Sequence, residues 1–294
     1  MRIKLIVNPS SGKTKVKRYL PTIEKMLSKE NWVERNFTSK SNDAFNFTYG
    51  MNPDNFDLIV IAGGDGTLNG AINGMLKANY SLPIGFIPLG TSNVFALCSG
   101  IPFDPVEACN TILKRRTKRV DLGKINSEDG IKYFTFVAGT GFDSLVVKEF
   151  NWNLKKIFGG VMAHVFSAIY ELAKLDLPEL NIEADGTLYK GYQVIISNGK
   201  YYGVSSVMAP EADMFDGYLD LVIFKNNKKR DLIKYFLALG MGKHTDLEDV
   251  KYFKAKNIKV ESKKTSWVQI DGEIGGKLPQ KFSVVSGGLE VILP

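Results

Sequence analysis

The chain has 294 residues, of which 44% are hydrophobic and 23% charged, a balance that excludes disordered, collagen-like and disulfide-scaffold chains. No apolar run reaches the ~18–20 residues that a helix needs to cross a bilayer. The net charge of +7 favours anionic partners, such as nucleotide phosphates or an acidic membrane face, although a solvated basic surface accounts for it equally well.

Strand and helix patterns alternate over the first ~120 residues, which predicts an open parallel sheet with helices on both faces. The predicted strands are Arg2–Asn8, Trp32–Thr38, Asp57–Ala62 and Pro83–Pro88. Apolar residues at helical spacing follow the first strand, the third strand and Asp104-Pro105, a pair typical of a helix start. Pro21 lies in the first of these helices and predicts either a kink or a later start.

The pattern changes near Leu122, where short strands and tight turns replace the alternation. Asp185-Gly186 lies between two strand patterns and predicts a two-residue hairpin. The further strand candidates are Val250–Val260, Ser266–Ile270, Phe282–Val285 and Leu289–Leu293, and the helix candidates are Leu154–Leu175 and Leu232–Leu239. We therefore predict an α/β domain, residues 1–122, and a β-rich domain, residues 123–294, whose final strand either stays there or returns to the first domain.

The strongest motif is Gly63, Gly64, Asp65, Gly66 and Thr67, between a buried strand and an amphipathic helix. Three glycines let the backbone approach a ligand closely, and the free N–H groups at the start of a helix favour a phosphate. A carboxylate beside phosphates is a typical Mg²⁺ ligand, directly or through water. The motif favours a phosphate and Mg²⁺ site over the alternative, a tight glycine turn with a capping Asp.

Two other loops follow predicted strands and carry polar side chains. They are Asn8-Pro9-Ser10-Ser11-Gly12-Lys13 and Gly90-Thr91-Ser92-Asn93. Each alone is weak, since Ser and Asn before a helix are ordinary caps. Together with the glycine motif they would share the sheet edge where ligands bind in open α/β sheets. The sequence contains no GxxxxGK[ST], so this is not a P-loop.

These loops belong to a series of motifs that spans nearly the whole chain in order. The others are Pro88–Ala96, Val120–Gly123, Phe134–Asp143, Asn198–Gly203, Ala209–Ala212, Asp216–Gly217 and Asp271–Glu273. The series resembles the diacylglycerol kinase catalytic-domain family, of the bacterial soluble lipid kinase type, to which sphingosine and ceramide kinases are related. The resemblance implies an α/β nucleotide-binding domain and a β-sandwich-like lipid-substrate domain, with the active site in the cleft between them, and an enzyme that uses ATP and Mg²⁺.

The resemblance also implies which residues hold the ligands. Those expected to bind ATP are Asn8, Ser10, Ser11, Gly12, Lys13, Thr38, Gly63, Gly64, Asp65, Gly66, Thr67 and Thr91. Asp65 matches the residue associated with the Mg²⁺ of the nucleotide. A second, structural Mg²⁺ would be held by the Asp216 carboxylate and by the backbone carbonyls of Asp213 and Tyr218. The sequence departs from the family there, since Phe215 interrupts the usual acidic pair.

Asp271-Gly272-Glu273 is the candidate for proton transfer. A carboxylate within hydrogen-bond reach of an alcohol can take its proton as phosphoryl transfer occurs. Spacing alone favours a solvated turn, but Glu273 matches the proposed catalytic base of the family. Asp271 is either a second acid or a turn residue, so the predicted catalytic residues are Glu273, Asp65 and Asp271.

Cysteine usage and the motifs limit the expected cellular location of the protein and its expected partners. With only Cys98 and Cys109, and no CxxC, a reducing cytoplasm is expected, with transient visits to an anionic membrane that holds the lipid substrate. We expect no signal peptide, no lipid anchor and no nucleic-acid partner. His164 and His244 are too far apart in the sequence to predict a zinc site. The oligomeric state stays open, a homodimer included.

The most specific prediction is phosphorylation of diacylglycerol to phosphatidate. The alternatives are a kinase of another lipid alcohol, sphingoid or phosphatidylglycerol-like, a kinase of a soluble acceptor such as an NAD kinase, and a non-enzymatic nucleotide-sensing protein. The motifs Asn198–Gly203 and Ala209–Ala212 argue against an NAD kinase. The presence of both Asp65 and Glu273 argues against a non-enzyme.

Overall fold

The computed structural model describes residues 1–127, 130–148, 177–203 and 206–294. The predicted helix Leu154–Leu175, with His164, lies outside the described residues. The chain forms two compact units. Unit 1 comprises Met1–Leu122 with Ser286–Pro294, and unit 2 comprises Gly123–Val285. The last nine residues of the chain therefore lie with the first unit, not with the sequence that precedes them.

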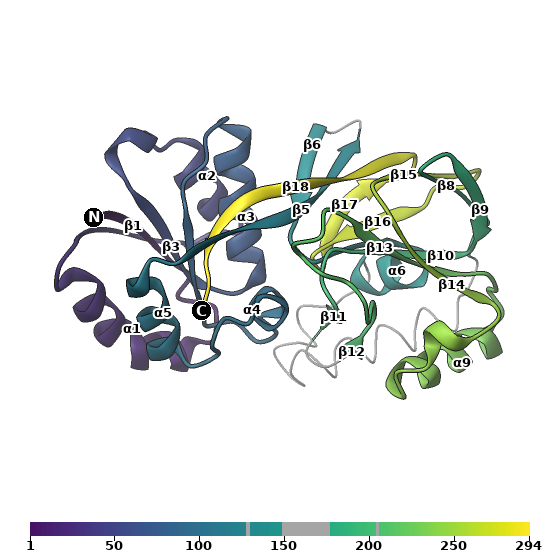
Figure 1. The fold of residues 1–294 in the computed structure, drawn as a ribbon, viewed down its shortest axis with the longest axis horizontal. Coiled ribbons are helices and arrows are strands. Elements are labelled where there is room, and N and C mark those ends of the chain that lie inside the picture. Colours follow the sequence, from purple (N-terminus) through teal and green to yellow (C-terminus); the bar gives the residue numbers. More distant parts are fainter. Residues whose placement is uncertain (128–129, 149–176, 204–205) are drawn as a thin grey trace. The chain divides into compact units, whose positions relative to one another are not determined.

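Unit 1 is built on a parallel sheet with strand order β2-β1-β3-β4-β18 (Figure 1). Its strands are β1 (Arg2–Val7), β2 (Trp32–Phe37), β3 (Leu58–Gly63), β4 (Ile84–Pro88) and the C-terminal end of β18 (Gln280–Ile292), where Val291 pairs with Ile84. Every residue of β3 and β4 is buried, which explains their uninterrupted apolar sequences. The predicted open parallel sheet is confirmed.

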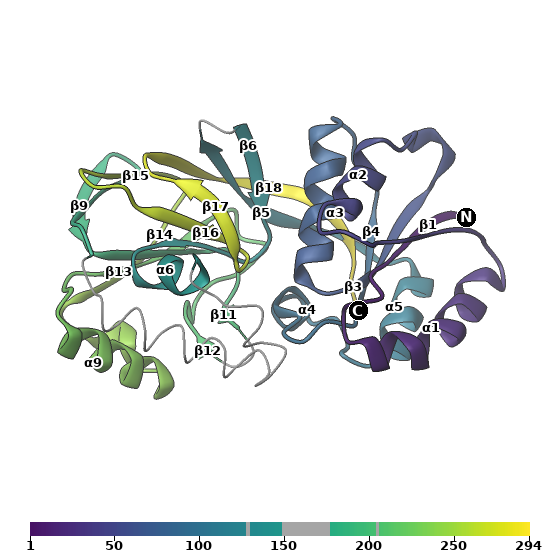
Figure 2. The same ribbon diagram turned by 180° about the vertical axis from the view of Figure 1, so that it is seen from behind.

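Helices follow the strands of unit 1. They are α1 (Lys13–Ser28), α2 (Asp43–Tyr49), α3 (Asp65–Lys77), α4 (Val94–Ser99), α5 (Pro105–Lys114) and the short η1 (Pro53–Asn55). Helices α1 and α5 pack together on one face of the sheet and α2 and α3 on the other (Figures 1 and 2). Helix α1 begins at Lys13 and continues through Pro21, so a later start is wrong. The Asp104 carboxylate caps α5 as predicted, accepting the N–H of Val106 at 2.9 Å.

The described part of unit 2 contains two large antiparallel sheets and the small antiparallel pair β11–β12. One has the order β14-β13-β10-β7-β16-β17, and the other comprises the N-terminal part of β18 with β15, β8 and β9, and the β5–β6 pair. The strands are β5 (Thr117–Ser127), β6 (Gly130–Phe134), β7 (Val137–Thr140), β8 (Leu180–Ala184), β9 (Thr187–Gly191), β10 (Gln193–Ser197), β13 (Leu219–Phe224), β14 (Val250–Ala255), β15 (Asn257–Ser262), β16 (Trp267–Ile270) and β17 (Glu273–Lys277). The remaining elements among the described residues are α6 (Phe142–Lys148), β11 (Tyr201–Tyr202), β12 (Ser206–Val207), α9 (Lys229–Gly240) and η2 (His244–Asp246).

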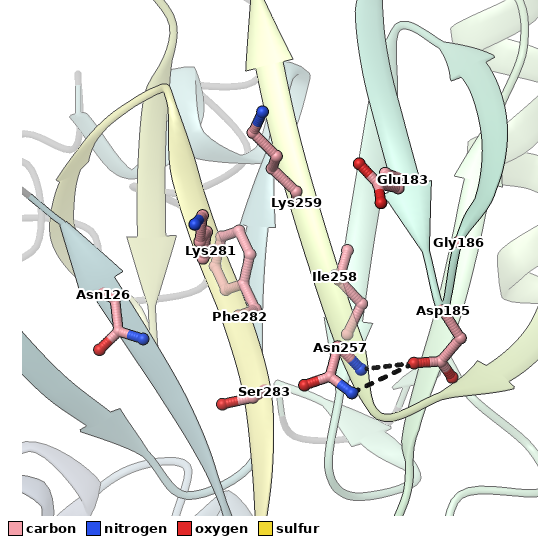
Figure 3. A pocket seen from close by; sticks show the side chains of 10 residues that line it. All are labelled: Asn126, Glu183, Asp185, Gly186, Asn257, Ile258, Lys259, Lys281, Phe282 and Ser283. Carbon is pink, nitrogen blue, oxygen red and sulfur yellow. Dashed lines mark hydrogen bonds between the residues drawn. The ribbon is translucent and has the colours of Figure 1, made fainter.

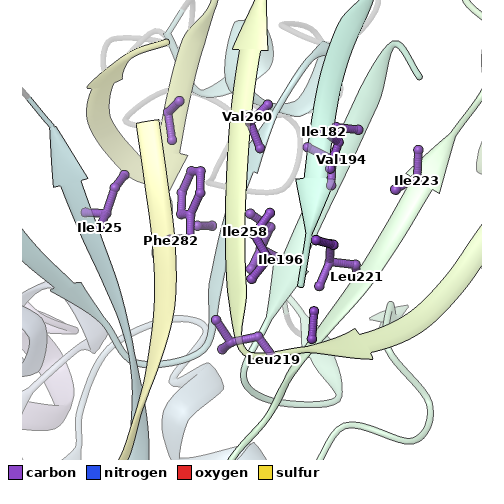
Figure 4. Close-up of a cluster of buried hydrophobic side chains, with 14 of the residues drawn as sticks. Ile125, Ile182, Val194, Ile196, Leu219, Leu221, Ile223, Ile258, Val260 and Phe282 are labelled. Atoms are coloured by element: carbon purple, nitrogen blue, oxygen red, sulfur yellow. The ribbon is translucent and has the colours of Figure 1, made fainter. Parts of the chain in front are cut away.

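The two large sheets of unit 2 enclose a common apolar core. Ile182, Ile258 and Phe282 come from one sheet and Val194 and Leu221 from the other (Figure 4). Strand β8 alternates buried and exposed residues, as expected when one face of a sheet packs on the core and the other meets water. The predicted β-sandwich-like fold is confirmed.

The structure corrects two strand boundaries in unit 2. The predicted strand Val250–Val260 is two strands in different sheets, because the chain turns at Lys256, where the Asp185 carboxylate accepts the N–H groups of Lys256 and Asn257 at 2.9 Å each. Asp185 itself belongs to the predicted hairpin between β8 and β9, which is confirmed. The two candidates near the C-terminus form the single long strand β18.

Candidate active site

Three glycine-containing loops meet at the edge of the unit 1 sheet where β1, β3 and β4 end. A Cβ atom on Gly90 would lie 2.6 Å from the Cα of Gly64, and a Cβ on Gly12 would lie 2.4 Å from the carbonyl oxygen of Leu89. Gly12 also has a φ of +60°, which disfavours any residue with a side chain. The backbones of the three loops are therefore in direct contact, and only glycine fits at these positions.

Hydrogen bonds join the polar residues of the same loops. The Asn8 side-chain amide donates to the Thr67 hydroxyl at 2.9 Å, and its carbonyl oxygen accepts the N–H of Ser10 at 2.9 Å. Thr38, which follows β2, donates its backbone N–H to the carbonyl of Val7 at 2.9 Å. Unit 1 thus brings the predicted nucleotide-binding residues after β1, β2, β3 and β4 to one edge of its sheet.

Much of this edge is open to solvent, which a nucleotide site requires. The exposed members of the predicted set are Ser10, Gly12, Lys13, Gly66 and Thr91. Thr67, by contrast, is only 7% exposed, so it supports the loop through Asn8. Within the described part of the chain the Lys13 ammonium forms no ion pair, so its charge is available to an anion.

The Asp65 carboxylate ties the Gly63–Thr67 loop to α4. Its Oδ2 accepts the N–H of Val94 and its Oδ1 accepts the N–H of Phe95, both at 3.0 Å. Two carboxylate oxygens offer about four lone-pair positions, so a half-buried Asp65 can also hold Mg²⁺ through water. The described residues contain no group of three or more His, Cys, Asp or Glu suited to a metal, so the remaining ligands would be phosphate oxygens and water.

In unit 2, Asp271 is a buried acid with a structural role. Its Oδ2 accepts the backbone N–H of Thr135 at 2.6 Å and the hydroxyl of the same residue at 2.8 Å. Its Oδ1 accepts the N–H groups of Phe136 and Val137, both at 3.0 Å. Burial raises the pKa of Asp271 above its usual range, although each of these hydrogen bonds favours the ionised form. With a φ of +47°, Asp271 fits the turn-residue alternative.

Glu273 differs from its neighbour, although both belong to one turn. It begins β17 and is exposed, and its carboxylate accepts no hydrogen bond from the described residues. The surrounding protein partly desolvates the carboxylate and raises its pKa, and the negative charge of Asp271 raises it further. A carboxylate with a raised pKa and no fixed donor is a better proton acceptor than an ordinary Glu.

A buried network that the sequence analysis missed supports this turn. The Gln269 side chain donates to the Asp143 carboxylate at 3.1 Å and accepts the N–H of Gly272 at 3.0 Å. Burial raises the pKa of Asp143 to about 7, and the Tyr202 side chain also bonds to it. The network ends one residue from Glu273. Its only signal in the sequence is the Gln within the otherwise apolar strand β16.

The expected second Mg²⁺ site, at Asp213, Asp216 and Tyr218, does not fit a resident metal. Asp216 Oδ2 accepts the Lys254 ammonium at 2.6 Å, and Oδ1 accepts the N–H of Tyr218 at 2.9 Å. Lys254 also donates to the carbonyl of Glu211 at 3.0 Å. The ammonium group supplies the positive charge at this loop, so the loop needs no second metal ion.

A pocket of about 450 Å³ lies elsewhere in unit 2, along β8, β15 and β18 (Figure 3). Its charged side chains have both signs, with Glu183 and Asp185 beside Lys259 and Lys281. Asp185 already accepts backbone N–H groups, as described above. None of the predicted site residues lines this pocket, and its mixed charge does not favour a phosphate.

Comparison with known proteins identifies the family. Residues 2–125 match the family model described as the diacylglycerol kinase catalytic domain, and residues 136–293 match the YegS C-terminal NAD kinase beta sandwich-like domain. A diacylglycerol kinase of Staphylococcus saprophyticus subsp. saprophyticus is 32% identical over 296 residues, covering 100% of this chain and 95% of the relative. The chain belongs to the diacylglycerol kinase family. The resemblance inferred from the motifs is confirmed.

Two further members of this diacylglycerol kinase set agree in length and in fold. A diacylglycerol kinase of Staphylococcus aureus (strain MRSA252) is 32% identical over 300 residues, covering 100% of this chain and 92% of the relative. The crystal structure of a candidate diacylglycerol kinase from Bacillus anthracis str. Sterne superposes with a TM-score of 0.83 at 26% identity, covering 100% of this chain and 95% of that one. These findings support a lipid kinase family.

Among the helices that the structure describes, none is both long enough and apolar enough to span a bilayer.

Proposed function

We propose that this enzyme transfers the γ-phosphate of ATP to the hydroxyl group of diacylglycerol, giving phosphatidate and ADP. The observation that carries the proposal is the Glu273 carboxylate, which has a raised pKa and no hydrogen-bond donor among the described residues. It occurs in a chain whose full length matches diacylglycerol kinases.

The nucleotide is assigned to the three loops of unit 1. Close backbone contact among Gly12, Gly64 and Gly90 leaves peptide N–H groups, rather than side chains, to meet the phosphates. Lys13 adds a positive charge from the first loop. Mg²⁺ bound with the nucleotide would neutralise charge on the phosphate oxygens, and Asp65 is the residue that would hold it through water.

We assign to Glu273 the uptake of the proton from the acceptor hydroxyl group. As the hydroxyl oxygen of diacylglycerol forms its bond to the γ-phosphorus, the bond from that phosphorus to the β–γ bridging oxygen breaks, and ADP leaves. The hydroxyl proton moves to Glu273, whose raised pKa favours its uptake. Asp271 and Gln269 hold the turn and are assigned no proton transfer.

The proposed place of action is the cytoplasmic face of a membrane, visited reversibly. The acceptor resides in the lipid, and Cys98 and Cys109 form no disulfide in the part of the chain that the structure describes, as suits a reducing compartment. The net charge of +7 favours an anionic leaflet.

Phosphorylation assays with labelled ATP test the acceptor. Purified enzyme receives diacylglycerol, sphingosine or phosphatidylglycerol in mixed micelles, or NAD in solution, each with Mg²⁺. We expect turnover on diacylglycerol, with phosphatidate as the labelled product. Turnover on NAD alone would reject a lipid acceptor, and turnover on another lipid alone would replace diacylglycerol. Absence of turnover on every acceptor, with ATP bound, would favour the nucleotide-sensing alternative.

A further inference from the structure

Helix α9 presents an apolar face to solvent. One side of the helix packs into unit 2 through Leu232, Tyr235 and Ala238. The other side carries four large apolar residues that we call the α9 apolar face: Ile233 (49% exposed), Phe236 (74%), Leu237 (58%) and Met241 (67%), the last just past the helix end. Residues three and four apart share a helix face, so these side chains form one stripe.

An exposed stripe of this kind is unusual on a water-soluble surface. A surface helix normally buries its apolar side and exposes polar residues. Here both sides are apolar, and the exposed one is continuous over nine residues of sequence. Single exposed apolar residues need no explanation, but contiguous ones mark an interaction surface.

Basic residues flank the α9 apolar face at both ends. The segment 228–243 contains five basic residues and one acid, Asp231. Lys228, Lys229 and Arg230 stand at the start of the helix, and Lys243 stands just beyond its end. The Arg230 side chain is 78% exposed, at 3.8 Å from the Asp231 carboxylate. An apolar stripe with a basic flank matches the headgroup and acyl layers of an anionic bilayer.

The buried side of α9 is anchored independently of this surface. The Tyr235 hydroxyl donates to the Asp249 carboxylate at 2.8 Å, and its ring contacts that of Phe224 with centroids 4.8 Å apart. The N–H of Lys243 donates to the carbonyl of Ala238 at 2.8 Å, closing the helix end. Polar substitutions on the exposed stripe therefore leave the anchoring contacts intact.

We propose that α9 docks unit 2 on an anionic lipid surface. Ile233, Phe236, Leu237 and Met241 enter the boundary between headgroups and acyl chains, and the flanking lysines and Arg230 meet the lipid phosphates. The biological purpose of this docking rests on the proposed function, since diacylglycerol resides in the same bilayer. A second copy of this chain is a poorer occupant, because a symmetric contact would set one basic helix against another.

Vesicle co-sedimentation without ATP tests the docking. The probes are phosphatidylcholine vesicles with and without phosphatidylglycerol. The double variant Phe236→Asp, Leu237→Asp should lower the partition coefficient by at least about tenfold, since each side chain no longer enters the apolar layer. The variant Lys228→Gln, Arg230→Gln should lose about fivefold per residue on phosphatidylglycerol vesicles only.

A matched control separates docking from general loss of apolar surface. Ile131 on β6 is 53% exposed, and β6 lies on the opposite side of unit 2 from α9 in both views (Figures 1 and 2). Ile131→Asp should therefore bind vesicles like the wild type. Equal vesicle binding by the α9 variants and the wild type would overturn the proposal. So would a dimer, measured by light scattering, that the α9 variants dissociate without any change in vesicle binding.

Two activity assays distinguish failure of the docking from failure of the proposed function. On a soluble short-chain diacylglycerol, the Phe236→Asp, Leu237→Asp variant should keep the kcat/KM of the wild type. On long-chain diacylglycerol in vesicles it should lose activity in parallel with vesicle binding. A wild type that phosphorylates no lipid, while its α9 variants still lose vesicle binding, would reject the function and retain the docking.

Discussion

Two turns of the molecule carry acids, Gly63–Thr67 in unit 1 and Asp271–Glu273 in unit 2, and they use those acids differently. Asp65 is the single acid of its turn, and it caps α4 through both oxygens while remaining half-buried beside the glycine-containing loops. In the other turn the tasks are divided: Asp271 accepts the backbone N–H groups of residues 135–137, and Glu273 accepts no hydrogen bond from the residues that the structure describes.

The difference shows that the fold can engage one acid of a motif fully and leave another exposed. Hydrogen-bond donors around a carboxylate stabilise its charge and lower its basicity. A turn with two acids can give its hydrogen-bond donors to the buried one and leave the other exposed to solvent. A turn with one acid must combine the two tasks, which suits an ion held through water better than proton transfer.

The largest expected effect tests Glu273, the exposed member of the pair. Glu273→Gln keeps the shape of the side chain and removes proton uptake, so kcat should fall by roughly 10²–10⁴-fold. Thermal unfolding and ATP affinity should stay at wild-type values, because Glu273 accepts no hydrogen bond from the described residues. Unchanged kcat would remove Glu273 from the mechanism.

The free energy of unfolding should distinguish the two acids that have structural contacts, Asp271 and Asp65. Asp271→Asn turns an amide toward buried N–H donors and should lower the free energy of unfolding by about 3 kcal/mol. Asp65→Asn leaves a half-exposed cap and should cost about 1 kcal/mol. Urea unfolding of both variants measures the difference. Equal costs would mean that the burial of Asp271 does not matter, and the contrast between the turns would fail.

The next test concerns Asp143. Burial raises the pKa of its carboxyl group to about 7. Between the unfolded value of about 3.9 and 7, the native carboxyl holds a proton that the unfolded one has lost, so its contribution to stability falls as the pH rises through that window. Asp143→Asn removes this dependence. The stability of the variant relative to wild type should therefore rise by up to about 4 kcal/mol between pH 4 and pH 8.

Asp249 supplies the control for that measurement. The pKa of Asp249 is lowered despite the opposing effect of burial, because Lys234, Tyr235 and Asn226 bond to its carboxylate. Its contribution is present above the unfolded pKa and is lost as the pH falls. Asp249→Asn should therefore be less stable than the wild type at neutral pH, and this difference in the free energy of unfolding should shrink as the pH falls through the acid range. A relative stability of Asp143→Asn that is flat from pH 4 to pH 8 would contradict the buried, protonated state.

A smaller effect is expected at the glycine contact of unit 1. In Gly90→Ala the new Cβ would lie 2.6 Å from the Gly64 Cα, so the two loops must separate. We expect ATP affinity to fall by about tenfold, with kcat on diacylglycerol less affected. Gly100→Ala is the matched control, since it also lies in unit 1 and its Cβ would meet no atom within 4 Å, although its φ of +75° adds backbone strain. Isothermal titration with an ATP analogue measures both.

The smallest effect is expected for Mg²⁺ without nucleotide. Asp65 offers one carboxylate, and the Asp216 carboxylate already pairs with Lys254. Adding or chelating Mg²⁺ should therefore shift Tm by less than about 1 °C. A larger shift, lost in Asp216→Asn, would restore the second metal site.

The sequence predicted the fold class and the family from local signals. Continuous apolar runs such as Leu58–Ala62 specified buried parallel strands, and the Asp185-Gly186 pair specified a hairpin, because both depend on residues close in the chain. The motif series established the family, which the comparisons confirm. The assignments of ATP, Mg²⁺ and Glu273 to individual residues stay predictions.

The tertiary structure decided which residues far apart in the sequence contact one another. Only the fold sets Asp271 against the backbone of residues 135–137, and only the fold connects Asp143 through Gln269 to the turn of Glu273, across more than a hundred residues of sequence. It also decided that Lys254 neutralises Asp216 and that α9 keeps an apolar face in water. Hydrophobic periodicity reports which residues prefer burial, but hydrogen-bond partners and pKa depend on which groups the completed fold places within a few ångströms.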